Sequence, residues 1–97
     1  MSARLDMVLE VLRRHRQEAR DLGVELVGVI GSTARGDDRP DSDVDLVYEP
    51  RRPGHLWALL GLAARIEDEL GRRVDLVDRD MAPPDRWSWM ARDLVRL

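Results

Sequence analysis

The sequence predicts a small α/β domain, or α+β in the broader classification, with a mixed or antiparallel sheet of three to four strands packed by helices. Three short segments, at residues 24–30, 43–48 and 72–78, have the length and β-branched content of strands. Between and around them lie stretches whose apolar residues recur at helical spacing. The expected order is α-β-β-α-β-α in one domain, residues 1–97.

The first helix is expected over residues 3–22, where apolar residues recur every three or four positions and Gly23 follows as a stop. The run 24–30 carries one acidic residue and is otherwise apolar or glycine, which predicts a central strand covered on both faces. Gly28 within this run indicates a close approach by another backbone or a helix.

The second strand, residues 43–48, ends at a proline- and glycine-rich breaker at 50–54. A helix over residues 55–70 should follow, closed by a glycine, with Trp57 packed beside its apolar stripe. The stripe comprises Leu56, Leu59, Leu60, Ala63, Ile66 and Leu70. The crossover from the second strand to the third, residues 72–78, should be right-handed.

A last helix is expected over residues 86–97, with Asp85 as its cap after two prolines. Its core stripe comprises Trp87, Met90, Ala91, Leu94 and Leu97. Trp89 points away from that stripe, so it either anchors a partner or folds back on the sheet.

Composition and charge argue against a general nucleic-acid-binding protein, a membrane-spanning protein and a protein with cysteine-based sites. A net charge of −3 and a pI near 5.3 argue against a general nucleic-acid-binding protein, which usually carries a basic patch. No apolar run is long enough to cross a membrane and no charged-then-apolar leader is visible, so we expect a cytoplasmic protein. Without cysteine, a disulfide framework or a cysteine zinc site is impossible.

The candidate functional residues begin at Gly31, directly after the first apolar run. Gly31 allows a sharp turn, and Ser32 starts a short helical turn whose backbone N–H groups would face an anion. Ten residues later, Asp43 and Asp45 stand two positions apart, so their side chains share one face of a strand. Two adjacent carboxylates repel one another, and a bound Mg²⁺ is the natural reason to keep both ionised.

Two further residues are candidates for the same site. On the third strand Val74 and Leu76 share the more apolar face, which leaves Asp75 on the opposite, candidate active face; the alternative is a solvent-facing strand residue. Arg35 either neutralises phosphate charge or pairs with an acid of the sheet. The acids between residues 37 and 41 are expected to form turns.

The pattern Gly31-Ser32, ten residues, Asp43-Val44-Asp45, with Ala34-Arg35-Gly36 inside it, resembles the nucleotidyltransferase superfamily of DNA polymerase β. The short chain is most similar to the minimal nucleotidyltransferases, which are antitoxins of HEPN ribonuclease toxins. The resemblance implies a polymerase β-like nucleotidyltransferase fold, ATP as the donor of AMP, and two Mg²⁺ ions.

The resemblance also implies roles for the residues quoted above. Asp43 and Asp45 would bridge both metal ions, and Asp75 would bind the catalytic metal and help to deprotonate the attacking hydroxyl. The β- and γ-phosphates would be held by Gly31 and Ser32, with Arg35 beside them.

The acceptor implied by the resemblance is a tyrosine of a HEPN toxin, with which the chain would form a hetero-oligomer that completes the site. Two alternatives stay open. One is a non-catalytic antitoxin that neutralises its toxin by binding. The other is a nucleotidyltransferase that modifies a small molecule of the antibiotic type.

Overall fold

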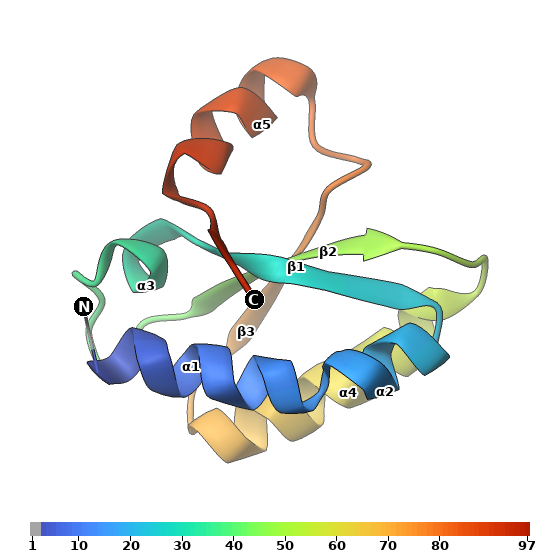
Figure 1. The fold of residues 1–97 in the computed structure, drawn as a ribbon, viewed down its shortest axis with the longest axis horizontal. Helices are drawn as coiled ribbons and strands as arrows, with labels where there is room; N and C mark the ends of the chain where they lie inside the picture. Colours follow the sequence, from blue (N-terminus) through green and yellow to red (C-terminus); the bar gives the residue numbers. More distant parts are fainter. Residues whose placement is uncertain (1–2) are drawn as a thin grey trace.

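A four-stranded sheet in the order β3-β2-β1-β4 organises the computed structural model, which describes residues 3–97 (Figure 1). β1 (Val24–Ile30) pairs antiparallel with β2 (Val44–Pro50), and β2 pairs in parallel with β3 (Val74–Asp78). β4 (Val95–Arg96) adds antiparallel to the free edge of β1. The predicted α/β class and mixed sheet are therefore confirmed.

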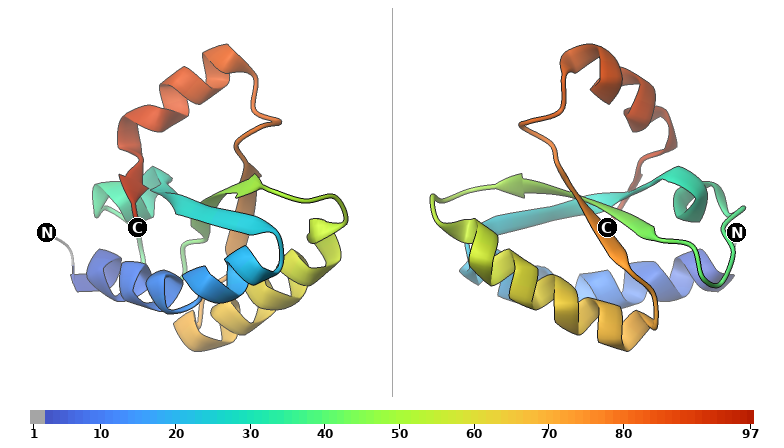
Figure 2. Two further views of the ribbon diagram at one scale, coloured as in Figure 1. Left: turned by 45° about the vertical axis from the view of Figure 1, so that its right-hand side comes forward. Right: turned by 180° about the vertical axis from the view of Figure 1, so that it is seen from behind.

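Three helices cover one face of this sheet: α1 (Ala3–Arg14), α2 (Arg16–Asp21) and α4 (His55–Leu70). They form the layer below the sheet in Figures 1 and 2. Aliphatic side chains fill the space between the layers, and burying this apolar area is the main force that holds them together. The largest fully buried members include Leu12, Leu26, Leu46, Leu59, Leu62 and Ile66.

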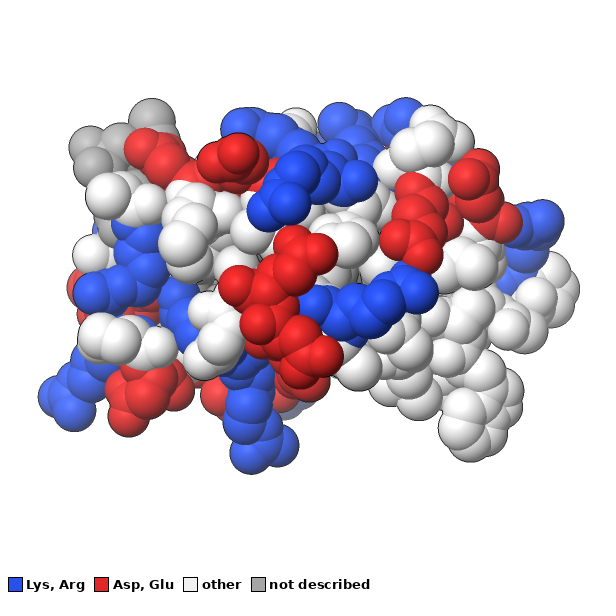
Figure 3. Space-filling view, turned by 90° about the horizontal axis from the view of Figure 1, so that it is seen from below, with Lys and Arg blue, Asp and Glu red and all other residues white. Residues whose placement is uncertain are grey.

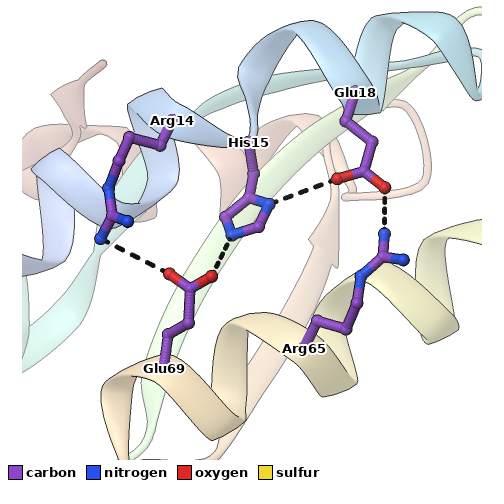
Figure 4. Close-up of polar contacts among 5 residues, drawn as sticks. All are labelled: Arg14, His15, Glu18, Arg65 and Glu69. Atoms are coloured by element: carbon purple, nitrogen blue, oxygen red, sulfur yellow. Dashed lines mark hydrogen bonds and ion pairs between the residues drawn. The ribbon is translucent and has the colours of Figure 1, made fainter.

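The first helix differs from the prediction of one helix over residues 3–22, because the chain breaks at His15. The imidazole of His15 lies between two carboxylates, with Nε2 2.9 Å from Glu69 Oε1 on α4 and Nδ1 3.4 Å from Glu18 Oε1. Figure 4 shows the charged network at this break: Arg14, His15, Glu18, Arg65 and Glu69. These contacts with α4 are tertiary, so helical spacing alone did not reveal the break.

The buried face of α4 is rotated from the predicted stripe. Leu62 is fully buried, whereas Leu56 and Leu60 are about half exposed, and Trp57, expected to be packed, is 84% exposed. The buried residues of α4 are spaced three and four apart from residue 59 onward, which leaves the first turn on the flank. Figure 3 shows the outside of the helix layer, where acidic and basic side chains alternate beside an uncharged area.

The last helix is shorter than predicted. α5 (Pro84–Met90) begins directly after Pro83, so Asp85 lies in its first turn and is not its cap. A short 3₁₀ helix, η1 (Ala91–Asp93), follows, and the chain ends in β4 instead of continuing as a helix to residue 97. α5 arches over the face of the sheet that the other helices leave open (Figures 1 and 2).

Gly28 explains why the C-terminal residues can join the sheet. A Cβ atom at this position would lie 2.1 Å from the carbonyl oxygen of Val95 and 2.9 Å from Cα of Arg96. No side chain fits there, so β4 can approach β1 only because residue 28 is glycine. The close approach predicted from Gly28 is confirmed.

A second, smaller core lies on this open face. Val27, Ile30 and Val47 are buried there, and Trp87, Met90 and Leu94 pack against them. Part of the predicted C-terminal stripe thus packs as expected, although Leu97 contacts the larger core. No helix within residues 3–97 combines the length and the apolar character needed to cross a bilayer.

Candidate active site

The site begins at α3 (Gly31–Arg35), a short helix that follows β1 without a linker. Gly31 has a φ of +76°, a left-handed conformation that favours glycine. A Cβ atom on it would lie 2.6 Å from Oδ2 of Asp45. The backbone at the start of α3 therefore stands directly against a carboxylate of β2. The helical turn predicted at Ser32 is confirmed.

The structure places Asp45 and Asp75 side by side as partners in the parallel pairing of β2 with β3. Both share a face with Val47 and Val77, which belong to the smaller core opposite the helix layer. The face predicted for Asp75 by alternation is thus the observed one. Asp43 is exposed and lies one residue before β2, so the strands predicted over residues 43–48 and 72–78 begin slightly later than expected.

The three carboxylates act on one another electrostatically. Burial raises the pKa of Asp45 above its ordinary value, and the negative charges of Asp75 and Asp43 raise it further. A hard divalent cation would offset this repulsion, and carboxylate oxygens are the ligands that Mg²⁺ prefers. The donor chemistry therefore fits such an ion.

The arrangement is not a closed metal cage. Within residues 3–97, no three acidic, cysteine or histidine side chains lie close enough together to hold one metal ion jointly. The exposed Asp43 and Asp75 would have to turn toward Asp45 to close around an ion.

A cavity of ≈ 460 Å³ opens beside Asp45, whereas Asp43 and Asp75 are not among its lining residues. This volume lies within the range of about 300–1,000 Å³ that is typical of small-molecule sites. The lining residues are Ile30, Gly31, Ser32, Arg35, Asp45, Val77, Trp89, Met90 and Asp93. The cavity thus joins the polar turn of α3 to an apolar wall supplied mainly by α5.

Trp89 belongs to that wall. Trp89 is 68% exposed, so it is not packed into the core of the sheet. The sequence alternative in which it folds back on the sheet is therefore wrong. Trp89 presents an aromatic surface to a cavity that also contains the α3 turn and Asp45. Helical spacing predicted that Trp89 points away from the core stripe, but it did not predict the cavity beside this side chain.

Arg35 spans the cavity from α3 to η1. Its Nη1 lies 3.0 Å from Oδ2 of Asp93, and its Nε lies 3.2 Å from Oδ2 of Asp37. Hydrogen bonds to Asp37 and Asp93 raise the pKa of Arg35. Of the two sequence alternatives for Arg35, the pairing with an acid of the sheet is wrong, because its partners lie in a loop and in η1. A bound phosphate could replace either partner, since the guanidinium is exposed.

Sequence reasoning missed a buried ion pair beneath the site. Asp38, assigned to a turn, has a side chain with no exposed surface, and its Oδ2 lies 2.9 Å from Nη1 of Arg72. Arg4 of α1 contacts the same residue. Arg72 stands just before β3 beside the exposed Arg73, so no local signal in the sequence distinguishes the buried arginine.

Comparisons with known proteins identify relatives of this chain and a family model that matches most of it. The nucleotidyltransferase domain family matches residues 12–93. Protein adenylyltransferase MntA from Thermococcus cleftensis is 38% identical over 74 residues, which cover 75% of each chain. A relative from Methanocaldococcus jannaschii, MJ1217, also named as a protein adenylyltransferase, is 30% identical over 77 residues, or 78% of this chain and 79% of its own. A solved minimal nucleotidyltransferase superposes with a TM-score of 0.71 at 33% identity, covering 92% of this chain and 95% of its own.

Proposed function

Because the chain belongs to the nucleotidyltransferase domain family and is an enzyme of that class, we propose that it transfers AMP from ATP to a hydroxyl group of another protein. The observation that carries this proposal is the position of Asp45. Its carboxylate lies beside Asp75, directly against the backbone of Gly31, and on the cavity that α5 borders. Asp45 and the proposed phosphate-binding turn thus line the same cavity.

In the proposed reaction the acceptor oxygen attacks the α-phosphorus of ATP. The bond between that phosphorus and the bridging oxygen breaks, and pyrophosphate leaves. Such transfers ask the protein mainly for positioning and for neutralisation of charge. Gly31 and Ser32 would bind the β- and γ-phosphates, Arg35 would exchange Asp93 for a phosphate oxygen, and Asp75 would accept the proton of the acceptor.

Asp43, Asp45 and Asp75 would hold two Mg²⁺ ions, which supply positive charge at the attacking and leaving oxygens when bound. The proximity of Asp43 and Asp75 to the half-buried Asp45 supports this assignment, because a divalent cation relieves their mutual repulsion. The exposed Trp89 and the half-buried Met90 provide a surface on which the adenine base can stack.

The acceptor is expected on another chain. Tyr48 is the only tyrosine in the sequence; its side chain is 5% exposed and belongs to the larger core on the helix side of the sheet. Its hydroxyl lies 3.4 Å from Oδ2 of Asp78, on the face opposite Asp45. The chain's own tyrosine is thus out of reach of the cavity.

We therefore propose that the acceptor is a tyrosine of a HEPN ribonuclease toxin and that the chain acts as its cytoplasmic antitoxin. Two lines of support are the resemblance of the Gly31-Ser32 and Asp43-Val44-Asp45 motif to minimal nucleotidyltransferases, and the name of the Thermococcus cleftensis relative, a protein adenylyltransferase.

Intact-protein mass spectrometry tests this function. A HEPN-family partner, prepared without exposure to this chain, is incubated with the chain, ATP and Mg²⁺. We expect its mass to rise by one or more AMP units with the wild type and with the control Asp68→Asn, an exposed residue of α4. No rise is expected with Asp43→Asn. A tight complex with no change of mass would support an antitoxin that acts by binding alone.

A further inference from the structure

One buried guanidinium connects the segments that carry the candidate active site. The side chain of Arg72 is 3% exposed. Its Nε donates a hydrogen bond to the carbonyl oxygen of Ser42 at 2.8 Å, and its Nη2 donates one to Oγ1 of Thr33 at 3.0 Å. Its Nη1 lies 2.9 Å from Oδ2 of Asp38. All three nitrogens of the group thus have partners in the connection from β1 to β2, which contains α3 and the loop after it.

Each hydrogen-bonded partner is next to a candidate site residue. Thr33, which is fully buried, follows Ser32 in α3. Ser42 directly precedes Asp43, and the guanidinium itself belongs to the residue three positions before Asp75. One rigid group therefore links the phosphate-binding turn, the start of the carboxylate strand and the start of β3.

Asp38 keeps the guanidinium in place. The contact between them is an ion pair by distance, without the alignment of a hydrogen bond, and both carboxylate oxygens are buried. Arg4 reaches the same carboxylate from α1, at 3.7 Å from Oδ1. A buried charge that loses its partner is strongly destabilising, so this pair persists as a unit.

Stability alone is a poor explanation for this arrangement. A buried ion pair can often be replaced by apolar residues of similar volume with little loss of stability. A planar guanidinium, by contrast, donates in several fixed directions, which holds backbone and side-chain atoms at set distances. Most of the loop from residue 37 to residue 42 is exposed and lacks helix or strand, so it needs such a fixed point.

We propose that Arg72 is a positioning residue for nucleotidyl transfer, which sets the distance between the phosphate-binding turn at Gly31-Ser32 and the carboxylates of Asp43 and Asp45. This inference rests on the proposed function. It adds that the geometry of the site depends on a residue that touches neither nucleotide nor acceptor.

Two substitutions test the proposal with little disturbance of the core. Arg72→Lys keeps the charge but loses the fork of donors, and Thr33→Val removes one acceptor at nearly constant volume. The matched control is Arg65→Met, which removes an exposed arginine of α4 that pairs with Glu18 on the helix layer. All variants are studied at a temperature where circular dichroism shows them fully folded.

The readouts are hydrogen exchange of the backbone amides of residues 31–43 in the chain without nucleotide, and the kcat and KM for AMP transfer. For both test variants we expect exchange in this segment to accelerate about tenfold while β1 stays protected. We expect kcat to fall about tenfold or more, since small misplacements of reacting groups are costly. The control should match the wild type in both measurements.

Exchange and kcat within twofold of the wild type in folded Arg72→Lys and Thr33→Val would overturn the proposal. If the wild type itself transfers no AMP, the proposed function fails, but the positioning role can still be decided. In that case the two readouts are hydrogen exchange of residues 31–43 and the dissociation constant for Mg²⁺-ATP. If Arg72 orders the turn at Gly31-Ser32, this constant should rise about tenfold in both Arg72→Lys and Thr33→Val.

Discussion

Replacing Asp45 by asparagine should make the metal-free protein more stable at neutral pH. Burial and the charges of Asp75 and Asp43 raise the pKa of Asp45, so the folded state disfavours its ionised form. A raised folded-state pKa contributes stability that is fully present below the unfolded value of 3.8 and is lost as the pH rises through the folded value. At pH 7 the wild type therefore carries the full penalty, and Asp45→Asn removes it.

The size of the effect follows from the burial of Asp45 and from the like charges around it. A like-charge neighbour on an adjacent strand destabilises by roughly 0.2–1 kcal/mol, and solvent screening keeps partly exposed groups toward the lower end. Burial, the cross-strand neighbour Asp75 and the nearby Asp43 together give a total of about 1 kcal/mol. For a domain of this length, that free energy corresponds to a rise in Tm of about 4–8 °C.

Thermal unfolding followed by circular dichroism measures this difference. We expect Asp45→Asn to have the higher Tm at pH 7 in a chelator, and the advantage to disappear as the pH falls below the ordinary carboxyl value of 3.8. Added Mg²⁺ should raise the Tm of the wild type more than that of the variant. An Asp45→Asn protein no more stable than the wild type at pH 7 in chelator would refute the reasoning, provided that the control Asp68→Asn is unchanged.

Three further substitutions probe the geometry of the site and the sheet. Gly31→Ala places a Cβ 2.6 Å from Oδ2 of Asp45 at a φ of +76°, so calorimetry should show ATP binding weakened about tenfold or more. Gly28→Ala places a Cβ 2.1 Å from the carbonyl oxygen of Val95; the clash should detach β4, cost about 1–3 kcal/mol in chemical denaturation and expose the C-terminus to proteases. Trp89→Ala should weaken ATP binding by about 1 kcal/mol or more, roughly fivefold, if the base stacks on this side chain.

Each of these has an outcome that would count against its reasoning. Unchanged ATP affinity in Gly31→Ala would show that the α3 turn is not part of the nucleotide site. A protease-resistant C-terminus in Gly28→Ala would show that β4 does not depend on this close approach. For Trp89 the matched control is Trp57→Ala, an exposed tryptophan on α4; equal ATP affinities in the two variants would exclude stacking on Trp89.

The elements that could be predicted from the sequence are those specified by local chemistry. β1 and α4 have the predicted bounds, because each is delimited by glycine or by a breaker; β1 is a continuous apolar run, and α4 has a clear helical period. Alternation along a strand also identified the face of Asp75, since the side chains of β3 follow a period of two. The catalytic and metal-binding roles of Asp43, Asp45 and Asp75 remain predictions.

The features that could not be predicted depend on contacts between distant residues. β4 exists because a glycine in β1 leaves room for a strand almost seventy residues later, so the helical spacing of residues 86–97 was misleading. Arg72 and Asp38 are 34 positions apart, and nothing in either local sequence shows that they meet in the core. The pairing of Arg35 with Asp93 could not be predicted for the same reason, because the fold alone brings η1 next to α3.

The most direct test of nucleotidyl transfer is to follow the two ends of ATP separately. The chain and a HEPN-family acceptor are incubated with ATP labelled either at the α-phosphate or at the γ-phosphate, with Asp43→Asn as the inactive control. We predict that the α-label enters the acceptor, that the γ-label leaves as pyrophosphate in equal amount, and that Asp43→Asn shows neither. Entry of the γ-label into the acceptor, or neutralisation of the toxin with no label transferred, would contradict the proposal.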